Sequence, residues 1–421
     1  MSPARFGLLV ILSLGIGACA VNPVTGREEL SLVSGSEEIA IGEREYGPAQ
    51  QSQGGPYYLD PKLQDYVRAV GNRLAAASDR QLPYEFVVLD NPVPNAWALP
   101  GGKIAVNSGL LLQLHDEAEL AAVIGHEIVH AAARHGASQM SKGSLINLGA
   151  ELLGVAGQQA GLGNLGGQAA QLGAGAWMAH YSREAELEAD AYGMDYMARA
   201  GYDPQAAVEV QETFVKLAAG GNSDFISGLF ASHPPSQERV NANQRRVQNF
   251  PPGGARNVEA YLRATARLRK DAPAYEAEKN ALAALKRKDA PGAIKALDQA
   301  IAIEPGEGRF WELRGHARAM LEQWSDADAD FTKAINCNPG HYRHYLARGA
   351  LRFERNQYPA AQRDLEESRR LLPTPLASLY LGEIAEANGA MRQADAYYRE
   401  AAVDNGAVGQ EARQRLGALI R

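Results

Sequence analysis

The residues best suited to chemistry are two histidines and a glutamate in the motif H-E-x-x-H at residues 126–130. The surrounding stretch, residues 116–135, is rich in Ala, Glu, Leu and Ile and has no proline, which predicts a helix. Positions i and i+4 share a helix face, so His126 and His130 can bind one metal ion. Glu127 lies beside them, where it can accept a proton from an attacking water. The alternative is a pair of unrelated surface histidines, which the motif and its helical context together disfavour.

A catalytic zinc ion takes three protein ligands and keeps one position open. A second acidic segment, in a helix expected at residues 177–200, places Glu186 and Asp190 four residues apart on one face. Glu186 is the candidate third ligand, and Asp190 is the candidate hydrogen-bond acceptor for a ligand histidine. Acidic helices are common, so spacing alone leaves this assignment open. Glu184 and Glu188 lie on other faces, and we expect them to be solvated.

Short strands should help to position these helices. Aromatic and β-branched residues at 84–89, bounded by proline and aspartate, predict one strand, and residues 103–106 are a second candidate. We expect segment 103–106 to pair with an extended substrate as an added strand. Residues 143–175 contain ten glycines, which predicts a mobile or loosely helical segment.

The N-terminus has the pattern of an export signal. Arg5 precedes the uncharged apolar run 6–18, which is shorter than the roughly 20 residues of a membrane span. The run ends in Gly17-Ala18-Cys19, which resembles the lipobox of bacterial lipoproteins. That resemblance implies cleavage before Cys19 and its acylation, and Ala20 at the next position implies the outer membrane. The alternative is an ordinary signal peptide and a soluble periplasmic protein.

Composition narrows the class of protein. The chain has 421 residues, 46% of them apolar and 22% charged, which indicates a globular protein of more than one domain. The net charge of -7 gives no basic footprint for nucleic acid. Two cysteines exclude a fold held together by disulfides. With Cys19 acylated, Cys337 has no partner, and we expect it to be a buried apolar filler.

The C-terminal part of the chain repeats with a period of about 34 residues. A small residue is followed four residues later by a large one and seven residues later by another small one. The positions are Ala293, Leu297 and Ala300; Ala327, Phe331 and Ala334; Ala361, Leu365 and Ser368; Ala394, Tyr398 and Ala401. This is the tetratricopeptide pattern, in which small residues lie where two helices touch. We expect about four units from residue 273 onward; the alternative is a non-repetitive helical bundle.

Taken together, the motifs resemble the metallopeptidase family that includes HtpX and the CAAX-prenyl proteases. The resemblance covers about residues 20–250. The segments that carry it are His126-Glu127-x-x-His130, Glu186-x-x-x-Asp190, Asn95–Gly102, Asn107–Leu111, and Ser232–Pro235 with Arg239. With the appended repeats, the chain is similar to periplasmic members of that family.

The resemblance implies one zinc ion per chain, bound by His126, His130 and Glu186. It implies that Glu127 is the general base and that Asp190 supports a ligand.

Two further residues, His233 and Arg239, each have two possible roles. In the periplasmic members, a histidine matching His233 can occupy the open zinc position and hold the enzyme idle. From the residues alone, His233 is a loop histidine before two prolines. Arg239 either stabilises an oxyanion or braces Glu186.

We therefore expect an α+β, mainly α, fold: a zincin-like peptidase domain with a small sheet, followed by an α-solenoid of tetratricopeptide repeats. The expected domains are a lipoprotein signal peptide (1–18), a lipidated tether leading into a helix (19–45), the metallopeptidase domain (46–250), a linker (251–272) and the repeats (273–421).

The expected function is zinc-dependent endoproteolysis in the periplasm, anchored to the outer membrane. The substrates would be misfolded or stalled outer-membrane proteins, with the repeats recruiting clients or the β-barrel assembly machinery. The alternative is a chaperone or scaffold lipoprotein with little proteolysis.

Overall fold

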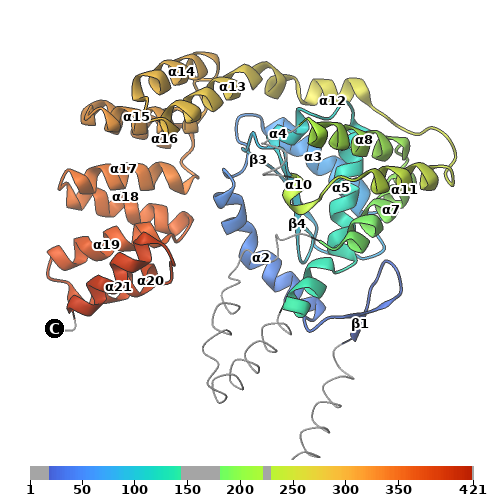
Figure 1. Ribbon diagram of the computed structural model, residues 1–421, viewed down its shortest axis with the longest axis horizontal. Coiled ribbons are helices and arrows are strands. Elements are labelled where there is room, and N and C mark those ends of the chain that lie inside the picture. Colours follow the sequence, from blue (N-terminus) through green and yellow to red (C-terminus); the bar gives the residue numbers. More distant parts are fainter. Residues whose placement is uncertain (1–18, 144–180, 221–228, 420–421) are drawn as a thin grey trace, which may run out of the picture. The chain divides into compact units, whose positions relative to one another are not determined.

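The computed structural model describes residues 19–143, 181–220 and 229–419 (Figure 1). They form two compact units. The N-terminal unit comprises Asp60–Ala266 with the residues up to Gly47, and the repeat unit comprises Pro48–Leu59 and Arg267–Arg421. The expected signal peptide (1–18) and residues 144–175 of the expected glycine-rich segment lie outside the described residues.

The N-terminal unit contains a hairpin, a three-stranded sheet and surrounding helices. Its strands are β1 (Cys19–Val21), β2 (Glu28–Leu30), β3 (Glu85–Leu89), β4 (Ala96–Leu99) and β5 (Lys103–Asn107). Its helices are α3 (Pro61–Ala75), α4 (Ser108–Leu111), α5 (Glu117–Ala132), α7 (Arg183–Arg199), α8 (Gln205–Ala219), α10 (Leu229–Ser232), α11 (Gln237–Val247) and α12 (Val258–Ala264). Helix α2 (Gly35–Ser52) precedes α3.

The two expected strands and the expected metal-site helices are confirmed. Residues 84–89 give β3 and residues 103–106 give β5. Asp116 caps α5, because its side chain accepts a hydrogen bond from the backbone N–H of Glu119. Every residue of α5 is buried, including its three glutamates and two histidines, and its remaining residues are apolar or glycine. Ser182 caps α7 in the same way, through the N–H of Ala185.

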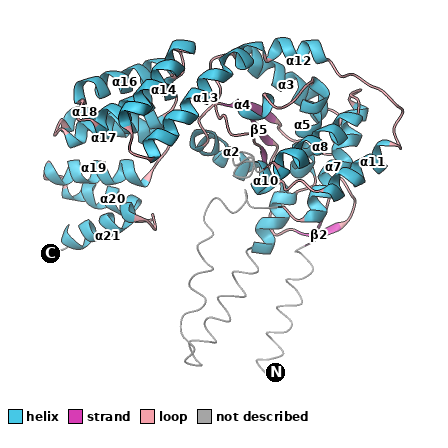
Figure 2. Ribbon diagram, turned by 45° about the horizontal axis from the view of Figure 1, so that its top comes forward, coloured by secondary structure: helices cyan, strands magenta, loops and turns pink. Residues whose placement is uncertain are grey.

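The role expected for segment 103–106 is wrong. The strand order is β3-β5-β4, with β3 parallel and β4 antiparallel to β5. Figure 2 shows β5 as a short strand among the helices of this unit. Both edges of β5 are therefore already paired, which leaves no backbone groups for an added strand. Strand β4 pairs only with β5 among the described strands, and it contacts α5.

Two segments are more regular than the sequence predicts. The segment expected to be a tether begins with a hairpin, Cys19–Leu30, in which β1 and β2 pair antiparallel. In the expected linker, 251–272, most of residues 258–272 are helical, in α12 and the start of α13. The side chain of Tyr261 explains this difference, because it is fully buried and its hydroxyl donates to the backbone carbonyl of Leu111.

The repeat unit consists of successive helix pairs, seen as stacked ribbons from α13 to α20 in Figure 1, and a final helix α21. The helices are α13 (Ala266–Lys286), α14 (Ala290–Ile303), α15 (Gly308–Met320), α16 (Trp324–Cys337), α17 (Tyr342–Glu354), α18 (Tyr358–Leu371), α19 (Pro375–Ala387), α20 (Met391–Ala401) and α21 (Ala407–Leu419). The α-solenoid expected from the 34-residue period is confirmed.

The repeated small and large positions form the helix contacts. All twelve side chains named for the repeat pattern are at most 1% exposed. A β-carbon on Gly315 would lie 2.6 Å from the Phe331 ring, and one on Gly382 would lie 2.5 Å from the Tyr398 ring. The paired helices therefore approach too closely for any side chain at these glycines. Cys337 is half-buried, less than expected.

No helix in the described ranges has both the length and the apolar character needed to cross a membrane.

Candidate metal centre

Helices α5 and α7 cross at two glycines, and this crossing brings the two sequence motifs together. A β-carbon on Gly125 would lie 3.2 Å from the carbonyl oxygen of Gly193, and one on Gly193 would lie 3.1 Å from the backbone nitrogen of His126. Contacts this short are rare for real side chains, so each glycine allows the close approach. The face of α5 that carries His126 thus lies directly against the face of α7 that carries Glu186.

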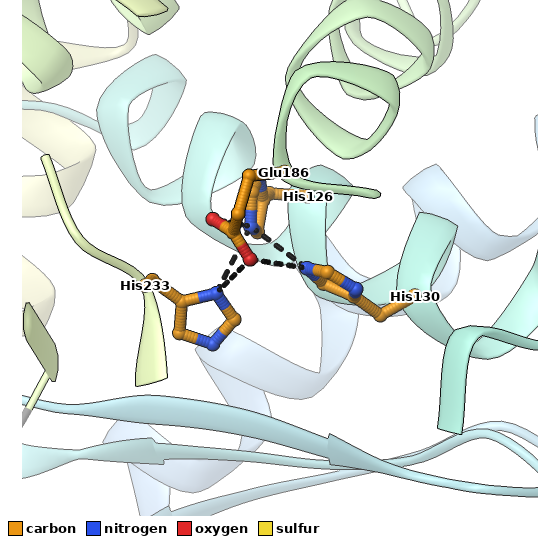
Figure 3. Close-up of side chains that lie close together, drawn as sticks. All are labelled: His126, His130, Glu186 and His233. Atoms are coloured by element: carbon orange, nitrogen blue, oxygen red, sulfur yellow. Dashed lines mark hydrogen bonds and ion pairs between the residues drawn. The ribbon is translucent and has the colours of Figure 1, made fainter. Parts of the chain in front are cut away.

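Four side chains converge at this crossing: His126, His130, Glu186 and His233. Each offers one ligand atom, and these atoms all lie within 4.8 Å of one another (Figure 3). His126 Nε2 lies 3.0 Å from His130 Nε2 and 3.3 Å from His233 Nδ1. Glu186 Oε1 lies 2.9 Å from His233 Nδ1 and 3.4 Å from His130 Nε2. All four residues are buried.

These separations fit a metal site. Ligand bonds of about 2.0–2.2 Å in a tetrahedral site place neighbouring ligand atoms about 3.3–3.6 Å apart. The observed separations are close to this range, and three imidazoles with one carboxylate are a donor set that suits zinc and similar divalent ions. The chemistry and the spacing of the side chains are therefore those of a site for a divalent cation.

The charges of the buried groups lead to the same conclusion. Burial opposes the charged form of His126, but Glu186 and Asp190 outweigh it and raise its pKa to about 10. Burial lowers the pKa of His130 well below its usual range, which favours the neutral imidazole that binds metals. Burial disfavours the charged Glu186, yet His233 and His126 hold its pKa well below the usual value. Without a metal ion, Glu186 and Asp190 favour a protonated, positively charged His126. A bound divalent cation would supply that positive charge instead.

Asp190 and Arg239 contact the candidate ligands from outside the cluster. Asp190 Oδ1 lies 2.9 Å from His126 Nδ1, the nitrogen that points away from the cluster. Arg239 donates from Nε and Nη2 to the Asp190 carboxylate, at 2.6 and 2.7 Å, and its Nη1 lies 2.8 Å from Glu186 Oε2. With its side chain 5% exposed and engaged in this way, Arg239 braces both carboxylates. The sequence left two roles open for Arg239, to stabilise an oxyanion or to brace Glu186. These contacts favour the second role.

Glu127 lies beside the cluster with a free acceptor. Its Oε1 is 3.5 Å from His233 Nε2, and its Oε2 is buried and has no hydrogen-bond partner among the described residues. Burial raises the pKa of this carboxyl, while His233 and His126 act in the opposite direction. A buried carboxylate oxygen without a partner is costly unless the site uses it. Glu127 is therefore placed to accept a proton.

An apolar cavity of about 480 Å³, including the part open to solvent, adjoins Glu127 and His233. Its apolar lining comes from α5, α7, α8 and α10: Val123, Met194, Val210, Phe214 and Leu229. The cavity brings an apolar surface directly to the residues that would perform the chemistry.

The sequence analysis did not predict that His135 and Glu188 lie at this site. Glu188 is not solvated as expected: its side chain is 10% exposed and lies 3.2 Å from His135 Nε2. His135 in turn contacts the candidate ligand His130. His135, the first histidine after the H-E-x-x-H motif, was a usable signal. The partner Glu188 was not, because its contact spans 53 residues.

The comparisons with known proteins agree with this geometry. Residues 61–247 match the family described as peptidase family M48. The metalloprotease YcaL of Escherichia coli is 30% identical over 190 residues, which cover 44% of this chain and 69% of that protein. The chain belongs to peptidase family M48, a family of metalloproteases, and this confirms the resemblance seen in the motifs.

Two longer matches cover somewhat more than half of this chain. The β-barrel assembly-enhancing protease of Yersinia pestis is 31% identical over 271 residues, covering 62% of this chain and 53% of that protein. Its namesake in Escherichia coli is 30% identical over 253 residues, covering 58% and 51%. The chain thus spans about half the length of these relatives. A solved tetratricopeptide domain of RPAP3, bound to an HSP90 peptide, aligns with 28% of this chain and 98% of its own at 22% identity, with a TM-score of 0.28.

Proposed function

We propose that this chain is a zinc-dependent endopeptidase of the bacterial cell envelope. The observation that carries the proposal is the buried group of His126, His130, Glu186 and His233, with the free carboxylate oxygen of Glu127 beside it. A zinc site of this composition next to a general base suits peptide hydrolysis. In this proposal His126, His130 and Glu186 hold one zinc ion per chain.

Each group at the site has a separate role in peptide hydrolysis. When bound, zinc polarises the scissile carbonyl and acidifies a water molecule. Glu127 accepts the proton of that water and passes it to the leaving amine. Asp190 keeps the proton of His126 on Nδ1, so that Nε2 presents its lone pair. An extended substrate pairs with the edge of β4, and the apolar cavity receives one of its apolar side chains.

His233 acts as a replaceable fourth ligand. Its Nδ1 is 2.9 Å from Glu186 and 3.3 Å from His126, within the ligand cluster, which supports this role. A histidine in the fourth position excludes the attacking water, because a catalytic zinc site must keep one position open. Withdrawal of His233 would start catalysis.

The substrates we propose are misfolded or stalled outer-membrane proteins. Two relatives are named β-barrel assembly-enhancing proteases, and this supports the choice. The repeat unit would recruit clients or the β-barrel assembly machinery, since solenoids of this kind bind proteins. Acylation of Cys19 would anchor the protein to the outer membrane. Ordinary cleavage of the signal would instead leave it soluble in the periplasm.

Cleavage by a single-site variant tests the proposal. Wild type should cleave casein or an unfolded outer-membrane protein, and a chelator should stop it. Glu127→Gln should lose cleavage while retaining zinc, whereas Glu184→Gln, an exposed glutamate on α7, should behave as wild type. If Glu127→Gln in clean protein cleaves at a substantial rate, Glu127 is not the base. If wild type cleaves nothing but binds unfolded clients, the chaperone or scaffold alternative is correct.

A further inference from the structure

His135 lies against the outer side of the ligand His130. The Nδ1 atoms of the two rings are 2.9 Å apart, and His135 is 6% exposed. Arg134, just after the end of α5, has a φ of 65°, and residues 135–143 start a new helical segment. This left-handed residue turns the chain, and its guanidinium is held by Glu38 and by the carbonyl of Val33. The turn places the His135 ring next to a histidine five positions earlier.

The contacts continue from His135 to the N-terminal hairpin. His135 Nε2 lies 3.2 Å from Glu188 Oε1. Asn22 Nδ2 donates to the same oxygen at 2.9 Å, and Arg27 Nη2 donates to Glu188 Oε2 at 2.8 Å. Asn22 is 2% exposed, and its side-chain oxygen caps the turn of the hairpin. Arg27 is 70% exposed, so its ion pair contributes little. Asn22 is thus the buried link between the hairpin and Glu188.

The direction of each hydrogen bond follows from metal binding. A histidine that binds metal through Nε2 carries its proton on Nδ1. His130 Nδ1–H must therefore donate to His135 Nδ1. That leaves the proton of a neutral His135 on Nε2, from which it donates to the Glu188 carboxylate. All ring nitrogens in the chain from His130 to Glu188 are then used with one consistent set of tautomers.

We infer that His135 and Glu188 are positioning residues for His130, and that the hairpin Cys19–Leu30 completes the arrangement by holding Glu188. The inference rests on the metal centre in the proposed function. His126 is oriented by a carboxylate directly, through Asp190, whereas His130 is oriented by a carboxylate through an intervening histidine. Groups that orient a ligand in this way strengthen metal binding.

The same hydrogen bonds couple the hairpin to the metal. Because the hairpin and the metal both favour one arrangement of His130, His135 and Glu188, each must stabilise the other by the same free energy. Zinc should therefore slow amide hydrogen exchange in residues 20–30. This coupling does not depend on any substrate.

Zinc affinity of the full chain, measured by competition with a chromophoric chelator, tests the inference. His135→Leu should bind Zn²⁺ about 10- to 100-fold more weakly. His135→Gln should stay within about threefold of wild type, since an amide can accept from His130 and donate to Glu188. His115→Gln, at an exposed histidine of the same unit, is the control and should have no effect. The visible spectrum of the Co²⁺ form should change in His135→Leu and return in His135→Gln.

The second arm of the test concerns the hairpin. Asn22→Asp keeps the acceptor for the hairpin turn but faces Glu188 with a like charge, so it should weaken Zn²⁺ binding and remove the zinc-dependent protection of residues 20–30. If His135→Leu does not fold, Glu188→Ala replaces it, with the exposed Glu184→Ala as its matched control. If the folded variant binds Zn²⁺ as tightly as wild type and has the same Co²⁺ spectrum, the inference about His135 and Glu188 is wrong, but the proposed function is unaffected. A wild type that binds no Zn²⁺ would instead overturn the proposed function.

Discussion

Asp190 Oδ1 lies 2.9 Å from Nδ1 of His126, on the side of the imidazole opposite the metal cluster. The same carboxylate accepts two hydrogen bonds from Arg239. In the function proposed above, Asp190 fixes the tautomer of His126, and the same carboxylate balances a buried guanidinium. One carboxylate would then serve both metal binding and the stability of the fold.

Replacement of Asp190 should affect both properties. Asp190→Ala should weaken zinc binding about 10- to 100-fold, because His126 loses its orienting acceptor. It should also lower the free energy of unfolding by about 3 kcal/mol, since Arg239 loses a buried partner. Asp195 lies on the same helix as Asp190, and Asp195→Ala breaks its partly exposed ion pair with Arg246 of α11. This variant should cost less than about 1 kcal/mol, with zinc affinity unchanged. Chelator competition and denaturant titration measure the two effects, and equal behaviour of both variants would contradict this account of Asp190.

Removal of His233 should release activity. His233→Ala opens the fourth position while leaving His126, His130 and Glu186 in place, so basal proteolysis should rise and the zinc content should stay the same. Hydrolysis of a quenched fluorescent peptide measures the change. His115→Ala, an exposed histidine, serves as the control. Unchanged or lower proteolysis by a folded His233→Ala protein rules out the blocking role.

Local sequence patterns were enough to predict the candidate metal-binding histidines and the repeats, but not the residues that contact them from distant parts of the chain. His126 and His130 are paired by helix geometry alone, and the repeats by a 34-residue period, so both could be read directly from the chain. Strand order depends on which neighbours a strand meets in space, and for that reason β5 was wrongly expected to accept a substrate strand. Asn22 and Glu188 meet across 166 residues, a contact without local signal.

The close helix contacts in the repeats predict opposite effects for two glycine substitutions. Gly315→Ala would place a methyl group 2.6 Å from the Phe331 ring and should destabilise the repeat unit by about 1–3 kcal/mol. Gly417→Ala, in α21, would place a methyl group with no described atom within 4 Å and should stabilise that helix by about 0.5–1 kcal/mol. Amide hydrogen exchange in α15 and α21 measures each effect. If Gly315→Ala leaves the stability of the repeat unit unchanged, the two helices can move apart enough to accept a methyl group, which would contradict this prediction.

The repeat unit also has a buried acid that should make its stability depend on pH. Glu278 is 3% exposed, and burial, opposed by Arg309, raises its pKa from 4.5 to about 7. Between these values the folded state binds more protons than the unfolded state, so the stability that Glu278 contributes is full below pH 4.5 and is lost as the pH rises towards 7. The loss should total about 3 kcal/mol.

The variant Glu278→Gln cannot titrate, so it isolates this contribution. The difference in opening free energy between wild type and Glu278→Gln, from amide exchange in α13, should fall as the pH rises from 4.5 to 7. A difference that stays constant or rises across that window would show that Glu278 is ionised throughout.

The most direct test of the central claim is the zinc content of the purified full chain, measured by elemental analysis after equilibration with Zn²⁺ and removal of free metal. We predict one ion per chain in wild type and in Glu127→Gln, and little or none in His130→Ala or Glu186→Ala. A wild type without zinc, or an ion that remains when His130 and Glu186 are replaced, would contradict the account.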